Sequence, residues 1–301
     1  MITDAVGQGR IGEREESAQE ILTEGDAMCE FCIQHGEGKK WYLQARNYSQ
    51  ELLNIERIRY VFNFANNIER WATDWASELD RLIITDPSSK PQFIARRTEE
   101  FKREHYGQIV PLEEIEQILD MTITIVRLPC VCRSALWGRY DARYCFGITT
   151  GIPLLRAFCS LYPDFSSDLE ILTRGEAKKA FQEHDHDGLV HSVWTFITPF
   201  IGVICNCTNK DCLPLKWRLR EGLTIFFKGE YVARIDWDNC VGCRDCMKLC
   251  NFGAIGYSAS LHKCHINQFQ CYGCGVCRAI CPYEAITLQD RNAIPLLAKE
   301  W

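Results

Sequence analysis

The feature that most constrains this chain is a pair of matching cysteine segments near its C-terminal end. The segments CVGCRDCMKLCNFGAI, beginning at Cys240, and CYGCGVCRAICPYEAI, beginning at Cys271, align residue for residue. Each contains the pattern C-x2-C-x2-C-x3-C, and such an internal repeat marks a duplicated structural unit. Three thiolates at this spacing are suited to one face of an iron-sulfur cubane, while the fourth, one helical step later, points towards a neighbouring cluster.

The repeat resembles the bacterial-type ferredoxin module with two [4Fe-4S] clusters, over roughly residues 231–288. The resemblance implies crossed ligation, with one cluster held by Cys240, Cys243, Cys246 and Cys281 and the other by Cys271, Cys274, Cys277 and Cys250. One position departs from the pattern, because Asn251 stands where the second copy has Pro282. We expect this amide to form a hydrogen bond near Cys250 and to alter the potential and solvent access of the second cluster. A zinc site is the alternative, although zinc sites usually use pairs of Cys-x2-Cys or Cys with His.

Composition places the chain among globular proteins that keep their thiols reduced. It has 301 residues, 47% of them hydrophobic, and a formal net charge of -6, which does not favour a nucleic-acid partner. Its 18 cysteines follow a polar, acidic start without the signature of a secretory signal, so we expect a cytoplasmic protein whose thiols bind metal. The longest apolar stretch, 189–205, is interrupted by polar residues and proline, which predicts core strands and no membrane span.

The remaining sequence predicts an α+β fold in three parts: a mostly helical region at 1–120, a cysteine-rich α+β region at 121–230 and the ferredoxin-like domain at 231–301. Apolar residues at steps of three or four predict a long helix over 56–84, and shorter helices are expected over 92–105 and 112–119. Crowded β-branched residues predict a strand at 121–129 that leads into a loop, and further strands at 189–204. Thr173 with Glu176 forms a capping-box start for another helix.

A second group of cysteines lies upstream of the repeat. Thiolates so close in sequence repel one another unless a cation neutralises them, so we interpret the group as metal ligands, with Arg133 near the sulfur charge. The segments LPCVCR, DGLVHSVW and ICNC are similar to a cysteine-rich region that precedes paired [4Fe-4S] motifs in uncharacterised iron-sulfur proteins of anaerobes, which implies an additional iron-sulfur cluster within 123–215. A zinc site, two separate sites and reduced core thiols are the alternatives. The expected ligands are Cys130, Cys132, Cys205 and either Cys207 or Cys212, with Cys145 as a substitute.

Other candidates carry weaker signals. Cys29 and Cys32 form a Cys-x2-Cys pair that is either half of a metal site or two incidental thiols. The segment HDHDG at 184–188 offers metal ligands, but it also suits a helix end capped by glycine. His191 is expected either in the core or as a donor beside the extra cluster. We interpret Cys159 and Cys264 as buried core thiols.

The absence of nucleotide-binding motifs reduces the number of functions that the sequence supports. No G-x-G-x-x-G follows a predicted strand and the chain has no P-loop, so neither a dinucleotide fingerprint nor a nucleotide-driven reductase activator is predicted. The chain also has no adjacent Cys-Cys pair, which argues against a likeness to the catalytic subunits of heterodisulfide reductases. We expect an iron-sulfur electron-transfer protein, working as a subunit or docking partner of a larger anaerobic redox complex. The alternative is a reductase in which the upstream cluster is the catalytic centre and the ferredoxin-like module supplies electrons.

Overall fold

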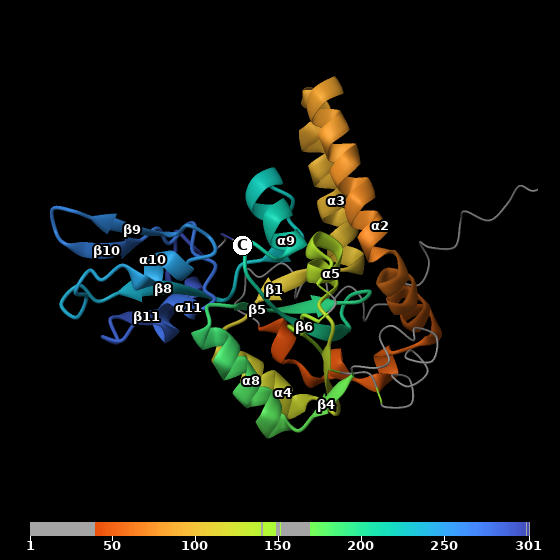
Figure 1. Cartoon of the computed structure of the whole chain (residues 1–301), viewed down its shortest axis with the longest axis horizontal. Coiled ribbons are helices and arrows are strands. Elements are labelled where there is room, and N and C mark those ends of the chain that lie inside the picture. The colour runs from red at the N-terminus through yellow and green to blue at the C-terminus, as the bar shows by residue number, and fades with distance from the viewer. Residues whose placement is uncertain (1–39, 140, 149–150, 152–168, 299, 301) are drawn as a thin grey trace, which may run out of the picture.

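The computed structural model describes residues 40–139, 141–148, 151, 169–298 and 300, and it shows an α+β fold. A central sheet carries helices on both faces, and a smaller β-rich domain extends from one side (Figure 1). None of the described helices combines the length and the apolar character needed to cross a membrane. The α-helices are α2 (Ile55–Thr85), α3 (Lys90–Glu104), α4 (Leu112–Met121), α5 (Val131–Trp137), α8 (Arg174–His186), α9 (Leu213–Lys216), α10 (Asp245–Leu249) and α11 (Val276–Ala279).

Short 3-10 turns and one π-helical turn complete the helical elements of the described residues. The 3-10 turns are η1 (Trp41–Leu43), η2 (Ala45–Tyr48), η3 (Gln50–Leu52), η4 (Pro87–Ser89) and η6 (Arg291–Ala293), and the π-helical turn is η5 (Trp217–Glu221).

The central sheet has seven strands in the order β4-β2-β3-β6-β5-β1-β7. Every pairing is antiparallel except that of β1 with β7. Since β1 precedes residue 121, the helical region and the cysteine-rich region contribute strands to one sheet. The strands are β1 (Gly107–Ile109), β2 (Ile125–Leu128), β3 (Cys145–Gly147), β4 (Glu170–Leu172), β5 (Val190–Thr195), β6 (Ile201–Cys207) and β7 (Phe226–Phe227).

Alternation along β5 divides the core into two layers. Val193 faces a cluster formed with α4 and α8, which lie together below the sheet in Figure 1. Val190 and Trp194 face the opposite side, where they pack among residues of α3, α9 and the smaller domain. Aromatic and aliphatic side chains dominate both layers, so hydrophobic burial holds the helices against the sheet.

Local sequence explains the helix boundaries. Asn54 caps α2 by accepting a hydrogen bond from the Arg57 N–H at 2.9 Å. Thr173 and Glu176 form the expected capping box at the start of α8. The helices predicted at 56–84, 92–105 and 112–119 are confirmed with small changes at their ends.

One local prediction was wrong. The segment CVCR does not form a loop after β2, because Cys130 is the N-cap of α5 and Cys132 lies inside that helix. The predicted strand at 121–129 is also shorter, since α4 continues to Met121 and β2 begins only at Ile125.

The smaller domain consists of two β-pairs and two short helices. Strand β8 (Tyr231–Ile235) pairs with β11 (Ile286–Asp290), and β9 (Ile255–Ser258) pairs with β10 (Lys263–Ile266), both antiparallel. The repeat aligns Ala233 with Cys264 and Leu288 with Tyr257. Ala233 faces Leu288 in one pair and Cys264 faces Tyr257 in the other, so the two pairs have the same register. The sequence repeat therefore produces a pseudo-twofold arrangement of strands and helices.

Candidate functional site: two matching cysteine cavities and an upstream thiol group

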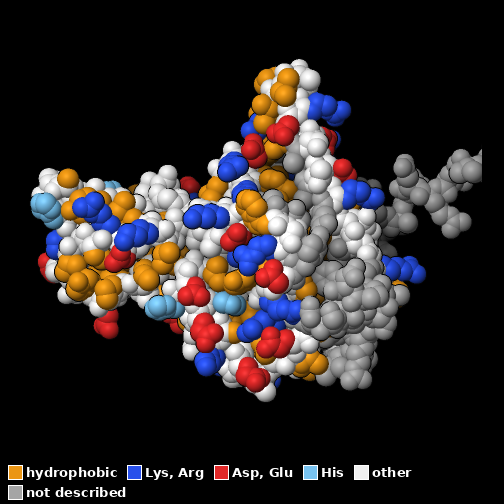
Figure 2. Space-filling view, in the orientation of Figure 1, with side chains coloured by type: hydrophobic (Ala, Val, Ile, Leu, Met, Phe, Trp, Pro, Cys, Tyr) orange, Lys and Arg blue, Asp and Glu red, His pale blue; other side chains and the backbone are white. Residues whose placement is uncertain are grey.

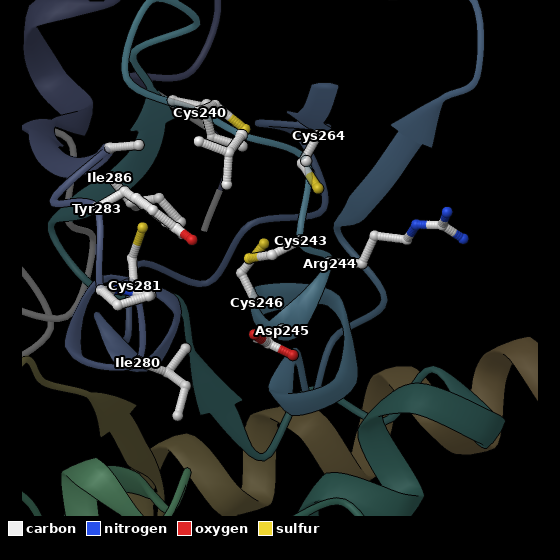
Figure 3. A pocket seen from close by; sticks show the side chains of 15 residues that line it. Cys240, Cys243, Arg244, Asp245, Cys246, Cys264, Ile280, Cys281, Tyr283 and Ile286 are labelled. Atoms are coloured by element: carbon white, nitrogen blue, oxygen red, sulfur yellow. The ribbon is translucent and has the colours of Figure 1, made fainter. Parts of the chain in front are cut away.

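The first cavity gathers cysteines from both copies of the repeat. Cys240 and Cys243 come from the loop after β8, Cys246 lies in α10, and Cys281 follows α11. Figure 3 shows these four side chains around one hollow, which has a volume of about 350 Å³. Cys243 is exposed, so this cavity approaches the surface.

The second cavity has the same construction with the copies exchanged. Its volume of about 360 Å³ is nearly that of the first, and its cysteines are Cys271, Cys274, Cys277 and Cys250. Most of the other lining residues also correspond, as Ile280 in the first cavity matches Leu249 in the second. Each cavity thus receives three cysteines from one copy and a fourth from the other.

Glycines give the loops their path around the cavities. Gly242 and Gly273 have positive φ angles of 71° and 70°, a conformation that glycine adopts without strain. A Cβ atom at Gly242 would overlap the carbonyl oxygen of His262, and one at Gly273 would overlap that of Tyr231. The close approach of backbone to backbone therefore requires glycine at both turns.

The chemistry of the donors fits an iron-sulfur cluster in each cavity. Burial raises the pKa of Cys246 to about 12, and burial also raises the pKa values of Cys274 and Cys277. Such thiols stay protonated unless a cation compensates their charge, and a bound metal deprotonates a coordinating thiol. Backbone N–H groups already point at the sulfurs, from Ala233 to Cys271 at 3.3 Å and from Ala254 to Cys250 at 3.3 Å.

The upstream cysteines also come together, and all six candidates in the described part of the chain take part. Strand pairing places Cys145 opposite Cys205, with 3.8 Å between their Sγ atoms, and Cys130 and Cys145 lie in the same buried cluster. Cys212 lies in one buried cluster with Cys207 and interacts electrostatically with both Cys132 and Cys207. Cys207 interacts electrostatically with Cys205, Cys130 and Cys132, which joins the two halves into one thiol group. We call these six residues the upstream thiol group: Cys130, Cys132, Cys145, Cys205, Cys207 and Cys212.

Arg133 supplies the positive charge of this group. Its side chain is 3% exposed, and it donates hydrogen bonds to Cys130 Sγ at 3.3 Å and to the Asn206 carbonyl oxygen at 3.4 Å. It also forms an ion pair with Asp211 at 3.3 Å and lies 4.0 Å from the centre of the Tyr144 ring. The guanidinium is therefore held against the sulfurs from several sides.

The thiols share protons unequally. The hydrogen bond from Cys145, together with Arg133, lowers the pKa of Cys130 to about 6, while the same hydrogen bond raises the pKa of Cys145. For Cys207, the hydrogen bond with Cys212 lowers the pKa, but burial and the neighbouring sulfur charges outweigh it and raise the value to about 11. A negative charge on one sulfur thus makes ionisation of the neighbouring thiols less favourable. A bound cation would compensate this repulsion.

A polar contact connects the upstream thiol group with the second cavity. Asn251, next to Cys250, accepts a hydrogen bond at its side-chain oxygen from the backbone N–H of Asn209 at 2.8 Å. The Asn209 side chain donates to the Asn251 carbonyl oxygen at 3.0 Å. Asn209 lies in the turn between Cys207 and Cys212, so the amide expected near Cys250 bonds to the loop that carries upstream thiols.

The two histidines His184 and His191, which the sequence offered as possible ligands or donors, contact polar and aromatic side chains. His191 is fully buried, and its Nδ1 lies 2.6 Å from the side-chain oxygen of Asn206, the residue between Cys205 and Cys207. His184 packs its ring against Tyr144 and Phe146. Within the described ranges, no three His, Cys, Asp or Glu side chains are placed to hold one metal ion. Cys29, Cys32 and Cys159 lie outside the described residues.

Cys264 is a neighbour of the first cavity that the sequence interpretation missed. It is buried, as expected for a core thiol, but it lines the cavity beside Cys243 and Cys246. Extending the repeat alignment towards the N-terminus, where β8 aligns with β10, would have placed it there.

The comparisons with known proteins agree with the geometry of the smaller domain. A family model described as a 4Fe-4S dicluster domain matches residues 233–288. The matched segment contains all eight cysteines of the two cavities. No curated protein matches the chain. The C-terminal part of the chain is therefore similar to a ferredoxin-like dicluster module, which suggests iron-sulfur electron transfer.

Proposed function

We propose that this chain relays single electrons between a redox partner protein and an additional iron-sulfur centre, through two [4Fe-4S] clusters. The observation that carries the proposal is the pair of matching cysteine cavities, the second of which is hydrogen-bonded through Asn251 and Asn209 to the loop of the upstream thiol group. Bound clusters of this type accept and release one electron each, usually at low potential. The protein would supply the sulfur ligands, the hydrogen bonds to them and the packing that keeps the three sites in fixed positions.

We assign the ligands of the two clusters from the cavities. Cys240, Cys243, Cys246 and Cys281 would hold one cluster, and Cys271, Cys274, Cys277 and Cys250 the other. The backbone N–H groups of Ala233 and Gly273 donate to Cys271 Sγ at 3.3 and 3.4 Å, which orients this thiolate towards its metal. Because the ligands are shared between the copies, neither half can bind its cluster without the other.

The third centre would use four sulfurs of the upstream thiol group. Ligands of a cubane bind different iron atoms, so they need not converge on one point as the ligands of a single zinc ion must. Arg133 would offset part of the charge of the thiolates, and the contact between Asn209 and Asn251 provides a short bonded route from Cys250 to Cys207.

The partner would approach the outer end of the smaller domain. Cys243 is exposed there, and Figure 2 shows hydrophobic side chains gathered over this end of the molecule. Several large ones of this domain are exposed: Trp237, Val241, Leu261, Phe269 and Tyr283. The first cluster would thus exchange electrons with the partner, and the second would face the upstream centre. The chain would act as a subunit or docking partner of a larger redox complex.

Anaerobic purification followed by iron and sulfide analysis tests the proposal. We expect about twelve irons per chain, corresponding to three cubanes, and three distinguishable EPR components after stepwise reduction. In Cys205→Ala, the upstream component should change and the iron content should fall to about eight, while the two dicluster signals stay as in the wild type. A wild-type content of about eight irons with an unchanged spectrum in this variant would remove the third centre from the proposal.

A further inference from the structure

The first cavity contains a fifth sulfur. Cys264 lies in β10, is 1% exposed, and lines this cavity together with the four proposed ligands. Figure 3 shows its side chain directed towards Cys243 and Cys246. Cys264 and Cys246 belong to the same buried cluster, and their thiols interact electrostatically.

The second cavity lacks this sulfur at the matching place. The spacing from Ala233 to Cys264 equals that from Cys240 to Cys271, so the repeat aligns Ala233 with Cys264. The structure agrees, because Ala233 lies in β8 and lines the second cavity as Cys264 lines the first. Two cavities that otherwise correspond at most lining positions therefore differ by one thiol.

The ligand assignment decides which of these two neighbouring thiols can donate a hydrogen bond to the other. A thiolate bound to iron has no proton to donate, so Cys246 becomes an acceptor once it is a ligand. Cys264 is outside the proposed ligand set and keeps its proton, which makes it the donor. Hydrogen bonds to cluster sulfurs stabilise the reduced, more negative state and raise the reduction potential.

We propose that Cys264 is a positioning residue whose S–H donates to Cys246 and raises the reduction potential of the first cluster above the value this site would have without it. This inference rests on the two dicluster sites of the proposed function and is independent of the third centre. Its consequence is that one electron shared between the two clusters resides more often at the outer site, beside the exposed Cys243. An S–H donor is weak, so we expect roughly a threefold effect on this distribution.

The repeat supplies matched variants for the test. Cys264→Ala gives the first site the side chain that the second site has at Ala233, and Cys264→Ser keeps a donor at the same position. Ala233→Cys introduces the thiol at the second site. Potentiometric titration followed by EPR measures both potentials in each variant, and Cys243→Ser identifies the signal of the first site because its ligand change is confined there.

We expect Cys264→Ala to lower the potential of the first cluster by about 28 mV, which is a threefold change at 59 mV per tenfold for one electron. The second cluster should be unaffected, Cys264→Ser should retain most of the wild-type value, and Ala233→Cys should raise the potential of the second cluster. Unchanged potentials in Cys264→Ala with full iron content would overturn the inference. Loss of about four irons in Cys264→Ala would also overturn it, because Cys264 would then be a ligand. A wild-type chain without [4Fe-4S] signals would instead reject the proposed function itself.

Discussion

Asn209 and Asn251 are joined by two hydrogen bonds of 2.8 and 3.0 Å, although one belongs to the upstream cysteine loop and the other to the dicluster domain. The Asn251 side chain also donates to the Gly188 carbonyl oxygen at 3.2 Å, at the end of α8. Asn251 is buried, so these bonds form where water competes little. Asn251, which aligns with Pro282 of the other copy, thus fastens the dicluster domain to the larger part of the molecule.

Replacing Asn251 by alanine should loosen this junction. Asn251→Ala removes three side-chain hydrogen bonds, those with the Asn209 N–H and with the Gly188 and Leu249 carbonyls, which should lower the free energy of unfolding by about 2 kcal/mol. Hydrogen exchange should increase at residues 188 and 209, and denaturant unfolding measures the stability. The matched control is Pro282→Ala at the corresponding exposed position, where we expect a much smaller change. Equal effects at both positions would argue against a junction role for Asn251.

Removing the charge of Arg133 should affect the upstream centre selectively. Arg133→Met keeps much of the side-chain volume but leaves the sulfurs without their guanidinium and Asp211 without its ion pair. We expect the iron content to fall by about four per chain while the dicluster EPR signals persist. Arg133→Lys keeps the charge but not the planar fork, so its iron content should lie between those of Arg133→Met and the wild type. Full iron content in Arg133→Met would show that the positive charge is not needed.

Two glycines with similar backbone angles should respond differently to substitution. Gly242 and Gly253 have φ angles of 71° and 64°, so alanine costs about 1 kcal/mol of conformational strain at either one. At Gly242 the new Cβ would also overlap the His262 carbonyl oxygen, whereas no atom lies within 4 Å at Gly253. We therefore expect Gly242→Ala to lose the first cluster and Gly253→Ala to retain it. Absorbance and iron content after anaerobic reconstitution compare the two variants, and similar incorporation would contradict the clash.

The stability of the larger part of the molecule should decrease in mild acid through His105. Burial lowers the pKa of His105 from 6.5 to about 4, and its Nδ1 lies 2.6 Å from the Thr195 carbonyl oxygen. As the pH falls from about 6.5 towards 4, the unfolded chain binds a proton that the folded chain does not, so the free energy of unfolding decreases. The loss is on the order of 2 kcal/mol at the lower end.

The variant His105→Gln isolates this contribution, because it keeps a donor but does not titrate. Urea unfolding at several pH values should give a smaller decrease for His105→Gln than for the wild type. Acid loss of metal would act on both proteins and cancels in the comparison. Identical pH profiles would show that protonation of His105 does not govern acid stability.

Local sequence signals predicted α2, α3, α4 and α8, because each of these helices carries its own signal. The apolar stripe of α2 and the Thr173 capping box of α8 are local features, and the structure follows them. The helix at Cys130 was missed because α5 is only seven residues long and follows a proline. So short a segment owes its helical form to tertiary packing rather than to propensity.

The candidate sites could be predicted from the sequence to different degrees. The repeat itself specifies eight cysteines, and the structure brings them into two groups of four. The upstream thiols are close in sequence only within each pair, so the meeting of Cys145 with Cys205 depends on the pairing of β3 with β6. The hydrogen bonds between Asn251 and Asn209 also depend on how the dicluster domain packs against the upstream cysteine loop. No local sequence pattern predicts that packing.

The register of β3 against β6 has a consequence for the order of assembly. Successive side chains of a strand point to opposite faces, so a slip of one residue would direct Phe146 towards Cys205 and turn Cys145 into the hydrophobic layer. The upstream thiol group therefore exists only after this sheet has closed in the correct register. The dicluster domain differs, because its small core gains stability from the metal it binds. Under the proposed function, one chain would thus combine a metal site that must follow folding with two that accompany it.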